Sequence, residues 1–240
     1  GMVTDYRAFG MTVIGASHIK SGSVCQDFSL SCELPDRRIS VVCDGHGGAD
    51  YFRSDRGSRF AAEAFTECMK DPDVISVLSA AATQKQQSGR IEQLIKSIIA
   101  RWNELVERDI KEHSFGEDEL SNISEKARKR YETGQRLQSA YGTTLIGVIL
   151  TEDFWLGLQI GDGKCVAVSK DGEFTQPIPW DEQCFLNVTT SICDENAAKE
   201  FRFCFERTLP AAVFIGSDGI DDCFAGDERL YDFYRLTLRS

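Results

Sequence analysis

The sequence Ile-Ser-Val-Val-Cys-Asp-Gly-His-Gly-Gly occupies residues 39–48 and joins a β-branched run to a glycine-rich loop. The run predicts a strand, and the loop places Asp44 and His46 where that strand ends. Loops at the end of a rigid sheet often carry functional side chains. His46 can exchange a proton near neutral pH, and the glycines let the backbone approach an ion or a phosphate group closely.

Composition narrows the class of protein. The chain has 240 residues, of which 42% are hydrophobic, and this is enough for one domain with a substantial core. Its net charge of −11 argues against nonspecific nucleic-acid binding, which needs a basic surface. The nine cysteines form no CxxC pair, so we expect reduced thiols in a cytoplasmic protein. No apolar stretch is long enough to span a membrane, and no secretory signal opens the chain.

The predicted elements run from strands to helices and back to strands. Strands are expected at 11–15, 28–34, 38–43, 143–150, 154–160, 164–169, 201–205 and 211–216. Helices are expected at 50–69, 90–106 and 226–239. The short link 151–153 predicts an antiparallel hairpin. This order favours an α+β fold with antiparallel sheets.

The predicted domain covers residues 3–240, because Gly1-Met2 is interpreted as a tag remnant. Residues 111–139 are highly charged and lack a sustained apolar period, which indicates a surface helical excursion.

Aspartates recur beside glycine, or in a loop, where predicted strands begin or end. They are Asp27, Asp44, Asp162 and Asp218, and the last is followed by Asp221 and Asp222. A single Asp-Gly pair is an ordinary turn, and Asp171-Gly172 is interpreted as one. Carboxylates that meet at the ends of buried strands are costly unless a cation binds them. An all-oxygen cluster suits Mg²⁺ or Mn²⁺, and two such ions can activate a water and stabilise a phosphoryl oxygen.

Together these motifs resemble the metal-dependent Ser/Thr protein phosphatases of the PP2C type, from about residue 12 to residue 224. The matching motifs are Gln26-Asp27, Asp44-Gly45-His46-Gly47-Gly48, Gly142-Thr143-Thr144, Gly161-Asp162-Gly163 and Ser217-Asp218-Gly219-Ile220-Asp221-Asp222. The resemblance implies a four-layer α-β-β-α sandwich with two antiparallel sheets. It also implies two Mg²⁺ or Mn²⁺ ions and a third, more labile one.

The resemblance assigns roles to individual residues. The implied metal ligands are Asp44, Gly45 through its carbonyl, Asp218, Asp162 and Asp222. Asp44 would bridge two ions, and Asp162 with Asp222 would hold the labile one. The implied reaction is hydrolysis of phosphoserine or phosphothreonine in proteins by a metal-activated water. His46 would be the general acid, and Asp27 would hydrogen-bond to that water.

The sequence departs from the family pattern at three places. Gln26 replaces the usual Glu, and Gly22 replaces the substrate-binding Arg. Lys20 is an alternative phosphate-binding cation, although a solvated loop lysine is an equal interpretation. The family's last motif, which supplies one more metal ligand on a C-terminal strand, has no counterpart before Ser240. Either the sequence is truncated or lacks a tail, or the site is incomplete; for the sequence as it stands, one metal position is expected to be weakened or vacant.

Three functions remain open at this stage. The first is a protein Ser/Thr phosphatase that acts on a phosphoprotein opposite a Ser/Thr kinase, as a monomer without nucleic-acid or membrane partners. The second is a pseudophosphatase that binds phosphoproteins with weak or no catalysis. The third is a phosphatase of small phosphorylated molecules. Retention of Asp44, His46, Asp162, Asp218 and Asp222 favours an enzyme, since a binding module has little need for so many converging carboxylates.

Overall fold

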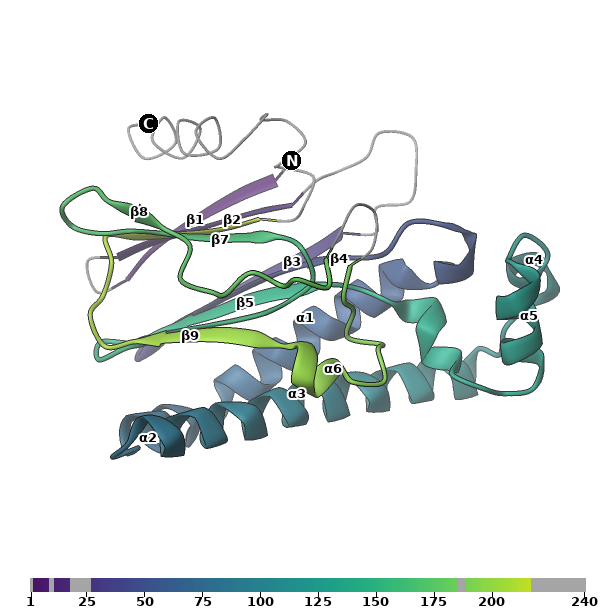
Figure 1. The fold of residues 1–240 in the computed structure, drawn as a ribbon, viewed down its shortest axis with the longest axis horizontal. Coiled ribbons are helices and arrows are strands. Elements are labelled where there is room, and N and C mark those ends of the chain that lie inside the picture. The colour runs from purple at the N-terminus through teal and green to yellow at the C-terminus, as the bar shows by residue number, and fades with distance from the viewer. Residues whose placement is uncertain (1, 9–10, 18–26, 185–188, 217–240) are drawn as a thin grey trace.

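The computed structural model describes residues 2–8, 11–17, 27–184 and 189–216, and these form two stacked β-sheets with helices along one side (Figure 1). Sheet 1 has the order β1 (Met2–Ala8), β2 (Met11–Ser17), β10 (Ala212–Gly216), β7 (Lys164–Val168) and β8 (Phe174–Thr175). Sheet 2 has the order β3 (Asp27–Leu34), β4 (Arg37–Asp44), β5 (Leu145–Leu150), β6 (Trp155–Ile160) and β9 (Arg202–Glu206). The α+β class with two stacked sheets is confirmed.

The pairings within the sheets refine the prediction. The expected hairpin is present, with Leu145 of β5 opposite Ile160 of β6. The expectation of purely antiparallel sheets is wrong at one pair, because β10 runs parallel to β2. The sequence interpretation missed β1 and set Met2 aside, whereas Met2 pairs with Ser17 of β2. It also missed the two-residue strand β8.

The helices of the described residues lie along the outer face of sheet 2 or project from one end of the sandwich (Figure 1). They are α1 (Ser54–Lys70), α2 (Val74–Ser79), α3 (Gln84–Glu112), α4 (Glu117–Leu120), α5 (Glu125–Glu132) and α6 (Ala197–Glu200), with 3₁₀ turns η1 (Ala49–Tyr51) and η2 (Leu137–Tyr141). Gly147 in β5 lets α1 approach closely, because a Cβ there would lie 2.4 Å from the Phe65 ring. The helix expected at 226–239 lies outside the described residues.

Helix ends differ from the prediction for local reasons. The first helix begins at Ser54 rather than near residue 50, because residues 49–51 form a separate 3₁₀ turn. The second extends well beyond its apolar stripe, and Thr83 caps it by accepting a hydrogen bond from the Gln86 N–H at 3.2 Å. The residues added at its two ends, 84–89 and 107–112, are mostly polar, so the apolar pattern did not predict them.

Two cores result from this layering. The larger core lies between sheet 2 and the helices and includes Phe65, Trp102 and Tyr141. The smaller lies between the sheets and includes Val42, Ile146 and Trp155. In the described part of the chain, seven cysteines are free thiols, and five of these are buried.

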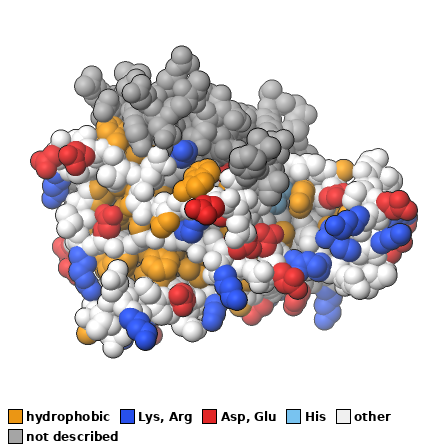
Figure 2. Space-filling model, viewed as in Figure 1, with side chains coloured by type: hydrophobic (Ala, Val, Ile, Leu, Met, Phe, Trp, Pro, Cys, Tyr) orange, Lys and Arg blue, Asp and Glu red, His pale blue; other side chains and the backbone are white. Residues whose placement is uncertain are grey.

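The predicted surface excursion spans the end of α3 together with α4 and α5, which project from one end of the sandwich (Figure 1). Figure 2 shows acidic and basic side chains mixed over this end of the molecule. Among the described helices, none is long and apolar enough to cross a membrane.

Candidate active site

Several strand ends meet at one edge of the sandwich. Asp27 begins β3 and lies opposite Asp44, the last residue of β4. The end of β6 lies at the same edge, because β5 pairs antiparallel with both β4 and β6. Gly216 ends β10 opposite Lys164, the first residue of β7. The ends of β4, β6 and β10 therefore lie at the same edge of the two sheets.

The loop after β4 is held by the motif that begins at Gly142. The Asp44 N–H donates to Thr144 Oγ1 at 3.1 Å, and the Thr144 N–H donates to the Asp44 carbonyl at 3.0 Å. The His46 N–H donates to the Gly142 carbonyl at 3.0 Å. A Cβ at Gly142 would lie 2.7 Å from His46 Cδ2, so only glycine fits. This motif thus fixes both Asp44 and His46.

His46 lies largely buried beside a polar cavity of about 290 Å³. Its ring meets that of Tyr51 edge to face, with 5.1 Å between centroids. Burial lowers the pKa of His46 to about 4, so the imidazole is neutral at neutral pH. The cavity is lined by His46, Gly47, Tyr51, Thr189, Ser191, Cys193 and Asp194.

Asp162 lies in the turn 161–163, which carries the chain from sheet 2 to sheet 1. Gly161 has φ of 101°, and a Cβ there would lie 2.4 Å from Thr144 Cγ2. A Cβ at Gly163 would lie 2.6 Å from the Gly216 carbonyl oxygen. The turn is therefore packed between the motif that holds Asp44 and the end of β10.

The oxygen-only character of these groups fits a hard cation such as Mg²⁺ or Mn²⁺. Asp27 and Asp44 offer carboxylates on adjacent strands, Gly45 offers a carbonyl, and Asp162 lies in the neighbouring turn. Within the residues described, no group of three or more His, Cys, Asp or Glu side chains forms a metal cluster by itself. Four predicted site residues lie outside the described part: Lys20, Gln26, Asp218 and Asp222.

The family resemblance places the segment between Asp171 and Glu200 beside the active site, but no contact of residues 189–194 was predicted. Ser191 accepts a hydrogen bond from the Thr143 N–H at 3.1 Å and donates to the Thr143 carbonyl at 3.2 Å. Tyr51 was also missed as a neighbour of His46. Neither carries a sequence signal, since a Thr-Thr-Ser run and a lone tyrosine are common on surfaces.

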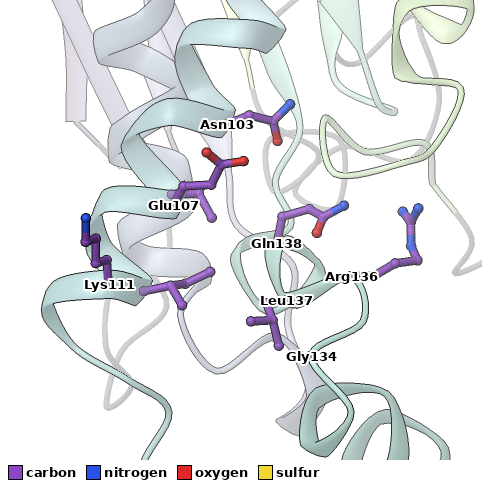
Figure 3. Close-up of a pocket in the computed structure, with 9 residues that line it drawn as sticks. Asn103, Glu107, Lys111, Gly134, Arg136, Leu137 and Gln138 are labelled. Carbon is purple, nitrogen blue, oxygen red and sulfur yellow. The ribbon is translucent and has the colours of Figure 1, made fainter.

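A larger cavity of about 500 Å³ lies elsewhere, between α3 and residues 134–138 (Figure 3). Figure 3 shows Glu107 and Lys111 on its α3 side, with Leu137 and Gln138 across from them. It contains none of the predicted site residues. Size alone therefore does not locate the site, whereas the convergence of strand ends does.

Comparison with known proteins agrees with this geometry. The family model described as protein phosphatase 2C matches residues 14–240. The chain belongs to this family. No curated protein sequence matches the chain.

Solved structures share the fold of this PP2C family member. One, described as a bacterial serine phosphatase, is 15% identical with a TM-score of 0.55, over 88% of this chain and 78% of that one. Another, PppA of Pseudomonas aeruginosa, described as a key regulatory component of T6SS, is 16% identical with a TM-score of 0.51, over 96% of this chain and 82% of that one. These likenesses support the fold.

Proposed function

We propose that this protein hydrolyses phosphoserine or phosphothreonine in proteins with the help of Mg²⁺ or Mn²⁺. The observation that carries the proposal is the pairing of Asp27 with Asp44 beside His46, at the edge where the strand ends meet. Membership in the PP2C family, which is metal-dependent, supports the same reaction class.

The divalent ions would be held by Asp44, Gly45, Asp162, Asp218 and Asp222. When bound, such ions activate a water and stabilise charge on phosphoryl oxygens. Asp27, opposite Asp44, would accept a hydrogen bond from the attacking water and orient it. Gln26 would bond to water beside it, and Lys20 would contact the phosphate.

His46 would give a proton to the serine or threonine oxygen that leaves. An imidazole with a pKa of about 4 holds little proton at neutral pH. A phosphate dianion in the adjoining cavity would raise that pKa, because an opposite charge favours the protonated form. In this proposal, binding of the phosphate dianion causes His46 to take up the proton that it then donates.

The substrate would be a phosphoprotein modified by an opposing Ser/Thr kinase. We propose that the protein acts as a monomer in the cytoplasm and binds neither nucleic acid nor membranes. Its net charge of −11 is consistent with that choice of partners.

The test is Mn²⁺-dependent hydrolysis of a phosphothreonine peptide and of p-nitrophenyl phosphate, with Asp44→Asn as the control. Activity should require Mn²⁺ and fall by about 10²-fold or more in the variant, because one carboxylate serves two ions. If wild type shows no activity above Asp44→Asn at millimolar Mn²⁺, the enzyme is excluded and the pseudophosphatase remains. Gln26, in place of a charged residue, is the observation that favours that second function.

The acid role of His46 has its own test. His46→Ala should slow the phosphopeptide by about 10²-fold. The loss on p-nitrophenyl phosphate should be much smaller, because nitrophenolate leaves without a proton. Equal losses on both substrates would remove His46 from the acid role.

A further inference from the structure

We propose that Thr190, Asp181, Arg202 and Gln159 are positioning residues that hold the turn 161–163 so that Asp162 faces the metal site. The inference rests on the proposed function, because Asp162 matters only if the site holds a cation. None of the four is expected to touch the metal or the substrate.

The backbone on both sides of Asp162 is bonded by side chains. Thr190 Oγ1 accepts a hydrogen bond from the Gly161 N–H at 3.0 Å. Gln159 Nε2 donates to the carbonyls of Gly161 at 3.3 Å and Gly163 at 2.6 Å. Arg202 Nη2 also donates to the Gly161 carbonyl. Three polar groups of a three-residue turn are thus occupied by side chains from outside it.

These side chains are themselves fixed. Thr190 and Gln159 are each 3% exposed, and Asp181 is 7% exposed. The Thr190 hydroxyl donates to Asp181 Oδ2 at 2.7 Å, which leaves its lone pairs for the Gly161 N–H. Arg202 Nη1 donates to the Pro179 carbonyl at 2.9 Å. Because Thr190 and Arg202 each have a second partner and Gln159 is buried, the turn has little freedom to rotate.

The turn needs this support for a physical reason. It crosses from one sheet to the other with φ of 101° at Gly161, and none of the described strand pairings includes residues 161–163. Residues that orient metal ligands through hydrogen bonds commonly change metal affinity by about 10–100-fold when they are lost. Thr190 and Asp181 lie in the segment between β8 and β9, so this segment would set the affinity of the site as well as border its cavity.

The experiment measures Mn²⁺ binding to metal-free full-length protein by loss of the free-Mn²⁺ EPR signal, with melting in chelator as the measure of folding. Thr190→Val removes the hydroxyl at constant shape and should weaken the weakest class of Mn²⁺ sites by about 10–100-fold. Thr190→Ser keeps the hydroxyl and should restore wild-type binding.

Thr151→Val is the matched control. Thr151 is also buried, and its hydroxyl holds the turn at the other end of the β5–β6 hairpin, accepting from the Phe154 N–H at 3.0 Å. This variant should lower the melting temperature and leave Mn²⁺ binding unchanged.

The outcomes separate this inference from the proposed function. Wild-type binding by Thr190→Val, equal weakening by Thr151→Val, or no Mn²⁺ binding by wild type would each overturn the inference. If Thr190→Val alone weakens Mn²⁺ binding but wild type hydrolyses no phosphopeptide, the positioning role stands and the proposed reaction fails.

Discussion

Arg53 and Arg202 both have largely buried side chains, but their surroundings are very different. Arg53 sits at the base of the helical excursion and donates to Glu119 at 2.8 and 2.9 Å and to the Tyr141 hydroxyl at 2.7 Å. Its guanidinium also lies 4.7 Å from the centroid of Phe115. Arg202 beside the candidate site donates to two backbone carbonyls. Among the described residues its Nε has no hydrogen-bond partner, and it lies 4.0 Å from Asp181 Oδ2.

The carboxylates in the two regions differ in the same way. Burial would raise the pKa of Asp109 and of Glu119, but hydrogen bonds from Tyr141 and Arg56 to Asp109, and from Arg53 to Glu119, lower both. Near the site, burial together with the charge and hydrogen bond of Asp194, and the charge of Asp181, raises the pKa of Glu200 to about 7.

The two regions therefore use their carboxylates differently, one for stability and the other in a way that suits binding. At the base of the excursion, the carboxylates of Glu119 and Asp109 are hydrogen-bonded to Arg53 and Arg56. Beside the candidate site, Glu200 and Asp194 act on one another, although Asp181 has Arg202 Nε at 4.0 Å, and a bound cation would relieve the repulsion. The first arrangement stabilises a fold, whereas the second suits a site that binds an ion.

The largest expected effect is a loss of stability in the region around Arg53. Arg53→Met should lower the free energy of unfolding by about 3–5 kcal/mol, because it leaves Glu119 and part of the charge of Asp109 without their partner. Urea denaturation followed by tryptophan fluorescence measures the loss. Arg128→Met is the control, since Arg128 and its partners Glu132 and Glu117 are exposed and the expected loss of stability is small. A loss as small as that of the control would contradict the structural role.

A smaller effect should appear in the second region. Arg202→Lys keeps the charge but cannot bond both Pro179 and Gly161, so the expected loss of stability is about 1–2 kcal/mol. Unlike Arg53→Met, it should weaken Mn²⁺ binding.

Combining Arg202→Lys with Thr190→Val tests whether the two side chains act on the same turn. Both side chains hold Gly161, so their effects on Mn²⁺ binding should be non-additive by about 0.5–3 kcal/mol in a double-mutant cycle. Strict additivity would show that the two side chains act on different parts of the site.

Much of the architecture was predictable because apolar periodicity reports burial directly. The β5–β6 hairpin and the central part of α3 follow from such patterns. β1 was missed, because its sequence, Met-Val-Thr-Asp-Tyr-Arg-Ala, has no clear apolar run and gains its order from pairing with β2. The parallel pairing of β10 was missed because it joins segments from opposite ends of the chain.

The site was predictable only in part. The glycines at 142 and 161 belong to the motifs recognised in the sequence. In the structure, a Cβ at either position would lie too close to neighbouring side chains. The support from Thr190, Asp181 and Arg202 could not be read from the sequence, because these residues follow no period and meet the turn only through tertiary folding. The roles assigned to the site residues all stay predictions, both for Asp27, Asp44, Gly45, His46 and Asp162 and for Lys20, Gln26, Asp218 and Asp222, which lie outside the described residues.

The smallest expected effect tests the repulsion beside the site through pH. Because the pKa of Glu200 is about 7 in the folded protein and ordinarily near 4.5, the folded state holds this proton more tightly than the unfolded state. Its contribution to stability is complete below about pH 4.5 and is lost as the pH rises through 7. Glu200→Gln stays neutral, so the variant should match wild type near pH 4.5 and be the more stable protein at pH 8.

The expected gain at pH 8 is modest because Glu200 is partly exposed and water screens the repulsion. It should be no more than about 1 kcal/mol, or about 2–4 °C in melting temperature for a chain of this size. Glu132→Gln is the control, because Glu132 is exposed and bonded to Arg128 at 2.8 Å. Thermal melts in chelator across this pH range measure both variants. A difference between Glu200→Gln and wild type that does not change with pH would mean that the carboxylates beside the site are balanced like those around Arg53, and the contrast between the two regions would not hold.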